Sequence, residues 1–448
     1  MLERLVEFSL TQRLLVVIAT LALIGAGVVA FNGLPIDAFP DVSSTQVKII
    51  MKAPGMTPEE VEARITTPIE LELLGIPNKK ILRSVSKYAI ADITIDFEDG
   101  TDIYWARSQV TERLNGIVRD LPEGTGGGLA PITTPLGEMF MFTIEGGDLS
   151  LQERRSLLDW VIRPALRTLP GVADVNTLGG EVRSFEVVPD NAALAARGVT
   201  LEALQRALET NNRNDGAGRL SDGEESLVVR AEGAIRDLDD VRAVVVSSRE
   251  GNPRRVGDLA TVRVGHLTRY GAVTRSDAAG QGEAVQGLVL GLRGANARQV
   301  VRGVQARLAE LAPTLPEGVT TQVFYDRGTL VERAVGTVSL ALAEAIVLVV
   351  VLLVLFLGNL RAALVVALTL PLAALATFVL MRRFGMSANL MSLGGLAIAL
   401  GMLVDAAVVV VENIVTHLAH ERDKAANRLP RLHVIYRAVR EVTLPVAS

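Results

Sequence analysis

The sequence of 448 residues contains no cysteine, few aromatic residues and no excess of basic charge. Without cysteine the chain forms no disulfides, and any soft metal ligand must be a methionine thioether. Aromatic residues make up 4% of the chain, which disfavours a drug-binding pocket lined by aromatic rings. The formal net charge of -5 provides no basic surface for nucleic acid. The composition therefore argues against a nucleic-acid partner and against a fold that depends on disulfides.

The sequence is rich in long apolar runs. Hydrophobic residues make up 49% of the chain, which is typical of a membrane protein. Four runs are long enough to cross a bilayer: Leu14 to Phe31, Val335 to Leu357, Ala362 to Met381 and Leu390 to Val411. The first run has no small-x-small cleavage site after it, so we expect it to be a retained anchor. We expect an α-helical transmembrane bundle with four spans in this chain.

Basic residues orient these spans. Arg4 and Arg13 precede the first, and a basic cluster follows the fourth: Arg422, Lys424, Arg428, Arg431, Arg437 and Arg440. Basic residues flank the cytoplasmic ends of spans, so both ends of the chain are expected in the cytoplasm. The roughly 300 residues between the first two spans, enough for two or more domains, are then external.

Asp405 lies in the middle of the fourth apolar run. A charged acid at the centre of a membrane helix costs roughly 2.5 to 3.5 kcal/mol, and is retained mostly where protons or ions are handled. At about 100° per residue, Met391, Ile398, Met402, Asp405 and Glu412 share one helix face. We predict that Asp405 carries the transported proton and that Glu412 assists proton exchange on the cytoplasmic side. A structural hydrogen bond or ion pair is the alternative for these acids.

The external segment repeats one structural unit. A strand at Gln46 to Lys52, a helix capped by Thr57, a strand at Ala89 to Phe97 and a helix at Asp102 to Leu121 form the first copy. The second copy has strands at Met139 to Ile144, Val172 to Leu178, Val285 to Leu292 and Thr320 to Tyr325, and helices at Ser150 to Leu169 and Ala297 to Leu311. Gly124 to Gly128 is expected to be a loop. The order predicts α+β subdomains of the split β-α-β, or ferredoxin-like, type.

The expected division of the chain follows from these elements. It runs 1–31, an N-terminal segment and the first span; 32–133, a first external subdomain; 134–190, the first part of a second; 191–275, a docking-like insert; 276–333, the remainder of the second; 334–357, 362–383 and 389–415, three further spans; and 416–448, a cytoplasmic amphipathic segment and the start of a fifth span.

Several motifs resemble one family. The segment Asn389-Leu390-Met391-Ser392-Leu393-Gly394-Gly395 and the run Val404 to Asn413 are similar to the fourth transmembrane helix of heavy-metal resistance-nodulation-division (RND) efflux pumps, the CusA/CzcA family. Further matches are Pro35-Ile36-Asp37-Ala38-Phe39-Pro40-Asp41, Phe97 to Asp102 with Trp105-Ala106-Arg107, and Leu357-Gly358-Asn359-Leu360-Arg361. The matches are spread over nearly the whole chain.

The resemblance implies an RND permease fold and a proton-driven antiporter, not an enzyme. Such a protein is a homotrimer of the inner membrane that works with a periplasmic adaptor and an outer-membrane channel. It holds no permanent cofactor and handles a metal cation and protons. Members are about twice as long, so the chain corresponds to the N-terminal half, and a second repeat supplies the helices that face Asp405. Two other functions remain open: a drug or amphiphile exporter of the same superfamily, and a truncated remnant that transports nothing.

The choice of metal depends on few residues. Drug exporters of this superfamily typically have two adjacent aspartates in this helix, whereas here Asp405 is followed by Ala406. Divalent-cation exporters of the heavy-metal branch often have an additional aspartate at the position of Ala399. Soft monovalent ions prefer thioethers, so Met391 and Met402 favour copper or silver slightly over zinc, cobalt or cadmium.

Two residues oppose this preference. Val410 replaces a methionine expected in copper and silver exporters, and Glu138 lies in a loop that resembles zinc-type members. Met139 and Met141 follow Glu138, but alternate methionines on a strand more often pack in a core than bind metal.

Overall fold

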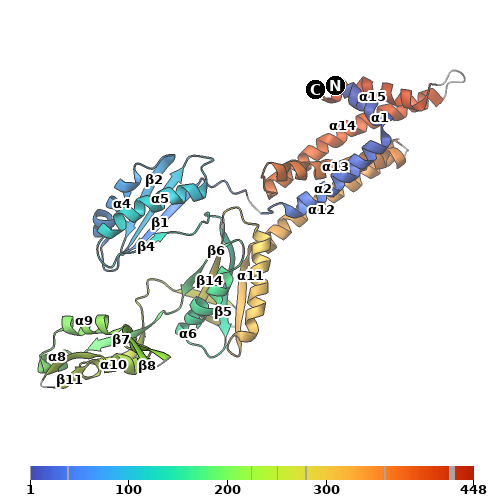
Figure 1. Ribbon diagram of the computed structural model, residues 1–448. Helices are drawn as coiled ribbons and strands as arrows, with labels where there is room; N and C mark the ends of the chain where they lie inside the picture. Colours follow the sequence, from blue (N-terminus) through green and yellow to red (C-terminus); the bar gives the residue numbers. More distant parts are fainter. Residues whose placement is uncertain are drawn as a thin grey trace.

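A bundle of long apolar helices and three sheet-rich units make up the protein (Figure 1). The computed structural model describes residues 2–37, 40–222, 225–249, 251–277, 280–357, 360–422 and 429–447. Both ends of the chain lie at the end of the helical bundle that is remote from the sheets.

The helical bundle consists of α1 (Leu2–Thr11), α2 (Arg13–Gly33), α12 (Arg327–Leu357), α13 (Leu360–Arg383), α14 (Leu390–Arg422) and α15 (Arg431–Ala447). Within the described ranges, three helices are long and apolar enough to cross a membrane: Arg13–Gly33, Ala362–Arg383 and Leu390–Arg422. They correspond to three of the four predicted spans. The remaining predicted span, 334–357, lies in α12 and stays a prediction.

Helix α14 is longer than its predicted span. It continues past residue 415 to Arg422 and has 33 residues, whereas about 20 suffice to cross a bilayer. The segment predicted from residue 416 therefore begins as a continuation of this helix. After residues 423–428, α15 returns and packs along α14.

The first sheet-rich unit has four strands: β1 (Gln46–Lys52), β2 (Lys79–Lys87), β3 (Ile90–Phe97) and β4 (Gly126–Leu129). Their order is β2-β3-β1-β4, and α3 (Pro58–Val61), α4 (Thr67–Leu73) and α5 (Ile103–Ile117) complete the unit. The core lies between sheet and helices, and includes Ile49, Ile65, Ile95 and Phe97.

Residues Gly124 to Gly128 were expected to be a loop, and this expectation is wrong for Gly126 to Gly128. Residues Gly126–Leu129 form β4, which pairs antiparallel with β1. Gly127 has φ +134, and a Cβ there would lie 2.2 Å from the Ile50 carbonyl oxygen. Since only glycine permits this approach, the run builds an edge strand where turn composition suggested none.

The second unit contains β5 (Glu138–Gly146), β6 (Val172–Gly179), β13 (Val273–Asp277), β14 (Gly280–Gly291) and β15 (Val319–Asp326). Strand β14 is central, because it pairs with β5, β6 and β13, while β15 pairs with the other edge of β5. The helices α6 (Leu151–Leu157), α7 (Arg163–Arg167) and α11 (Ala297–Leu311) pack on this sheet over a core that includes Phe140 and Phe142.

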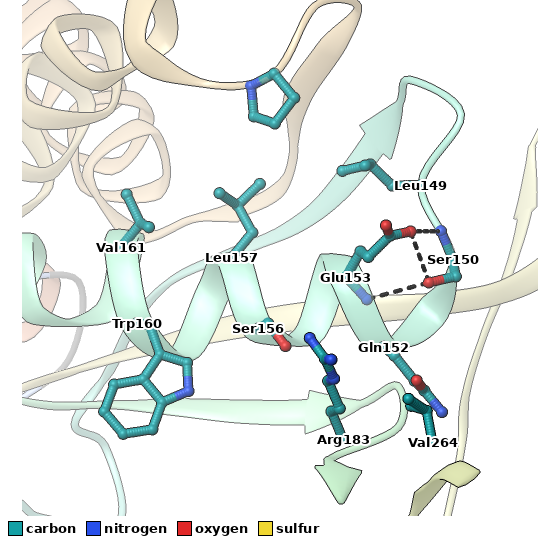
Figure 2. A pocket seen from close by; sticks show the side chains of 11 residues that line it. Leu149, Ser150, Gln152, Glu153, Ser156, Leu157, Trp160, Val161, Arg183 and Val264 are labelled. Atoms are coloured by element: carbon teal, nitrogen blue, oxygen red, sulfur yellow. Dashed lines mark hydrogen bonds between the residues drawn. The ribbon is translucent and has the colours of Figure 1, made fainter. Parts of the chain in front are cut away.

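The first helices of the first and second units are built in the same way. Thr57 and Ser150 each form a reciprocal capping box with the glutamate three residues later, and Figure 2 shows the bonds between Ser150 and Glu153. Each helix then widens into a π-helical segment, 62–66 or 158–162, that ends two residues before Pro68 or Pro164. The wider turn gives room to a proline ring that would clash within a regular α-helix.

A third sheet-rich unit interrupts the second between β6 and β13. Its strands are β7 (Arg183–Pro189), β8 (Asp215–Asp222), β9 (Glu225–Ala231), β10 (Val245–Arg249), β11 (Asn252–Arg255) and β12 (Ala260–His266), and its helices are α8 (Asn191–Arg197), α9 (Leu201–Asn211) and α10 (Leu238–Ala243). It has its own core, which includes Leu204, Val256 and Leu259. Strand β9 in the β8–β9 hairpin is exposed along its whole length.

Candidate functional site

The start of α14 is held firmly. The Asn389 backbone N–H donates to Ser392 Oγ at 2.9 Å, and the Ser392 N–H donates to Asn389 Oδ1 at 2.9 Å. The preceding Ala388 donates its backbone N–H to the Pro35 carbonyl and accepts from the Asp37 N–H. The loop after α2 therefore fixes where α14 begins. The position of each side chain along the axis of α14 is fixed as a consequence.

The two faces of α14 differ in what they contact. Leu393, Leu400 and Val404 are buried, and the latter two pack against α13 residues such as Val366 and Leu370. The opposite face carries Met391, Ile398 and Met402, with exposed fractions of 73%, 71% and 74%. Asp405 and Glu412 are also exposed. No other helix in the described part of this chain covers this face.

Asp405 and Glu412 lie on the uncovered face without partners. Among the described residues, neither side chain has a hydrogen bond or an ion pair. Seven residues separate them, which places them about 10 Å apart along the helix. Gly401 lies close to Asp405 in sequence and has open space where a Cβ would be. The two carboxylates are therefore open to whatever lies against this face of α14.

The methionines of α14 cannot bind one ion together. Met391 and Met402 are separated by eleven residues, or roughly 16 Å of helix rise, far more than two ligands of one metal allow. Met402 instead lies one turn from Asp405 on the same face. A thioether and a carboxylate are thereby neighbours at mid-helix.

Glu138 lies in another part of the molecule. It is exposed and begins β5 in the second sheet unit, so the structure does not bring it together with Met391 or Met402 (Figure 1). Met139 is buried, 4% exposed, and contacts the position where Gly291 would carry a Cβ. Met139 is therefore a core residue, and Met141 is half-buried. The described residues contain no group of three or more His, Asp or Glu side chains placed to hold a metal.

A cavity of about 660 Å³ lies beside α6, where the second unit meets the third. Figure 2 shows Trp160 and Arg183 on its walls, and Val264 comes from β12. The Trp160 side chain is 81% exposed. The one carboxylate in its lining, Glu153, is hydrogen-bonded to Ser150, so this cavity lacks the cluster of acids expected for a metal cation.

Two contacts at the far end of α14 were not anticipated from the sequence. Asn413 Nδ2 donates to the Ala438 carbonyl at 2.8 Å, and His417 Nε2 lies 3.0 Å from Glu441 Oε2. Both join α14 to α15. Asn413 belongs to a motif noted in the sequence, but its partner carbonyl carries no sequence signal.

Residues 5–448 match the AcrB/AcrD/AcrF family. The chain belongs to this family. It is 41% identical to the cation efflux system protein CzcA of Alcaligenes sp. (strain CT14), over 100% of this chain and 42% of that protein. It is 38% identical to the cation efflux system protein CusA of Escherichia coli (strain K12), over 94% of this chain and 40% of that protein. The resemblance to the CusA/CzcA branch is thus confirmed.

A solved structure has the same fold. The crystal structure of a heavy metal efflux pump superimposes with a TM-score of 0.87 at 35% identity, over 99% of this chain and 43% of that one. The chain therefore has the RND permease fold, and it spans less than half the length of the relatives that it matches.

Proposed function

We propose that the chain is part of a proton-driven heavy-metal efflux permease that moves a metal cation outward and protons inward. The observation that carries this proposal is Asp405, a carboxylate without a partner on an uncovered face of an apolar helix. A structural acid would be expected to have a hydrogen bond or ion pair in its own repeat, and Asp405 has none among the described residues.

The mechanism requires a second surface opposite α14. Protonation cancels the charge of Asp405, so the protonated and ionised forms differ in the cost of lying against an apolar partner. Proton uptake and release therefore favour different packing of α14 against the helices that cover it. Glu412, nearer the cytoplasmic end, passes the proton between Asp405 and the cytoplasm.

The transported ion is a cation that accepts thioether or mixed thioether and carboxylate ligands, copper(I) or silver(I) in preference to zinc, cobalt or cadmium. The lack of a second acid at Ala399 and the pairing of Met402 with Asp405 support this choice. Because Met391 lies roughly 16 Å from Met402, each serves as a separate station for the ion. Glu138 would act in the external part, apart from both.

The architecture of the family completes the proposal. Four spans, 14–31, 335–357, 362–383 and 389–415, anchor the chain in the inner membrane, and residues 32–133 and 134–190 with 276–333 form two periplasmic porter subdomains of the split β-α-β type. The strand order β2-β3-β1-β4 of the first unit supports this type. Residues 191–275 form the docking insert of a homotrimer that joins a periplasmic adaptor and an outer-membrane channel.

The test is Asp405→Asn in metal-sensitive cells that produce the chain together with the remaining length of the family. We expect the variant to lose metal resistance and metal-dependent proton uptake in vesicles, while its amount in the membrane and its oligomer size stay unchanged. Ile398→Leu, on the same exposed face of α14, is the control and should retain transport. Resistance of the Asp405→Asn cells equal to that of the parent would remove the proposal.

A further inference from the structure

A cavity of about 710 Å³ lies between α1 and α15, at the end of the bundle where both chain termini are found (Figure 1). Its walls carry both signs of charge, because Glu7 and Arg13 line it together with His433 and Tyr436. Within the described residues, neither Glu7 nor Arg13 forms an ion pair. The cavity thus presents a carboxylate and a guanidinium that do not neutralise each other.

The cavity adjoins a long exposed apolar surface. Arg13 is the first residue of α2, and Val17 follows it by one turn on nearly the same face. Val17, Ile18 and Leu21 are 54%, 54% and 62% exposed. A ligand held at Arg13 can therefore lay an apolar chain along α2, in the direction of the sheets.

We infer that this cavity binds the headgroup of a zwitterionic phospholipid whose cation is a primary ammonium. The phosphate accepts hydrogen bonds from Arg13 and from His433 or Tyr436, as basic pockets at the cytoplasmic ends of spans bind lipid headgroups. The ammonium donates to Glu7, which a quaternary ammonium cannot do because it has no N–H. The acyl chains follow the exposed stripe of α2.

The inference rests on the proposed membrane position of α2 but not on transport. Binding holds α1 and α15 together at the membrane surface, and α15 is already joined to α14 by Asn413 and His417. The lipid bound in the cavity would thereby affect α14, the helix that carries Asp405. That link makes the cavity a place where the bilayer stabilises the proton-carrying helix.

Native mass spectrometry of the purified 448-residue chain tests the inference, without metal or a proton gradient. The chain in detergent is offered equal amounts of phosphatidylethanolamine, phosphatidylglycerol and phosphatidylcholine with identical acyl chains. We expect phosphatidylethanolamine to be retained most. Arg13→Gln should lower its retention about fivefold, since one basic residue near the bilayer surface contributes about 1 kcal/mol to binding an anionic group.

Glu7→Gln distinguishes this site from general attraction to basic helices. It should remove the preference for phosphatidylethanolamine over phosphatidylcholine while phosphatidylglycerol binding rises. Arg431→Gln, at the exposed first residue of α15 and outside the cavity, is the matched control for Arg13, and Glu112→Gln in α5 is that for Glu7; both should behave as the parent. Equal loss with Arg13→Gln and Arg431→Gln, or no headgroup preference in the parent chain, overturns the inference.

A soluble headgroup separates a lipid from a free phosphate ester. Glycerophosphoethanolamine and inorganic phosphate should not displace the bound lipid, because they cannot contact the α2 stripe. Displacement at concentrations similar to those of the lipid would show a phosphate site and overturn the assignment to a phospholipid. Because no metal is present, failure here leaves the transport proposal standing, and failure of transport leaves this result standing.

Discussion

Arg327 and Asp37 form a two-pronged ion pair that joins segments 290 residues apart. Arg327 Nε donates to Asp37 Oδ1 and Arg327 Nη2 donates to Asp37 Oδ2, each at 2.9 Å. Nη1 donates to the carbonyl of Leu136, in the loop that leads to Glu138. The Arg327 side chain is 6% exposed and that of Asp37 22%. One guanidinium thus connects the exit of α2, the first turn of α12 and the start of β5.

Replacing either partner of this pair should destabilise the protein strongly. Asp37→Asn leaves a buried guanidinium without its counter-charge, a change that costs about 3 to 5 kcal/mol. Arg327→Lys should be nearly as harmful, since an ammonium cannot donate in parallel to both carboxylate oxygens and to Leu136. Thermal unfolding in detergent measures both variants and the double variant. Additive losses in the double variant would show that the two residues do not act as a pair.

A second prediction concerns the core of the second sheet unit. Gly287 on β14 pairs with Phe142 on β5, and a Cβ at Gly287 would lie 2.4 Å from the Phe142 ring. Gly287→Ala should therefore cost about 1 to 3 kcal/mol through overpacking. Phe142→Leu in the same chain should restore part of this loss by vacating the ring. Gly282→Ala, on the same strand with open space around it, should change the unfolding midpoint far less.

The periodicity of hydrophobic residues and the helix-capping residues predicted much of the fold. The strand Gln46–Lys52 and the helix Ala297–Leu311 lie where the sequence placed them, because each combines a clear period with a turn or cap at its ends. Strand β2 was not predicted, since six of the nine residues of Lys79–Lys87 are charged or polar and the strand is stabilised by pairing with β3. Pairing between distant segments leaves little local signal.

The candidate site was likewise predicted from the sequence only in part. The common face of Met391, Met402 and Asp405 follows from helical period alone, and no helix in the described residues covers this face. That Glu138 lies in a separate unit depends on tertiary arrangement, which spacing in the sequence does not carry. The Arg327–Asp37 pair was missed for the same reason, although the motif containing Asp37 was recognised.

A third prediction concerns acid stability. The hydrogen bonds from the Ser150 side chain and backbone hold the pKa of Glu153 below its ordinary value of 4.5. A group whose folded pKa is lowered stabilises the protein above its unfolded pKa, and this contribution disappears as the pH falls through the folded pKa. Glu153→Gln should therefore destabilise α6 at neutral pH and match the parent in strong acid. Hydrogen exchange of the α6 amides against pH measures this, with Glu112→Gln as a control that should show no such difference.

A fourth prediction separates the two roles open to Glu412. If it passes protons, Glu412→Gln in the longer transporter should slow metal-driven proton uptake without lowering the amount of protein in the membrane. If it is structural, the protein should disappear from the membrane. Asn413→Ala provides the contrast, because it removes the hydrogen bond to the Ala438 carbonyl and should loosen α15. A Glu412 variant that is lost from the membrane as fully as a misfolded one would contradict the proton role.

The metal itself can be assigned by testing three substitutions against four ions. Cells that produce the chain with the remaining length of the family are grown on silver, copper, zinc and cobalt. With thioether stations on α14, resistance to silver and copper should fall in Met391→Leu and Met402→Leu, because leucine keeps the volume and removes the sulfur ligand. Glu138→Gln, remote from α14, should leave that resistance intact. Resistance confined to zinc or cobalt, lost in Glu138→Gln and kept in Met391→Leu, would reverse the assignment. That outcome would locate metal selection in the second sheet unit, where the exposed carboxylate of Glu138 begins β5.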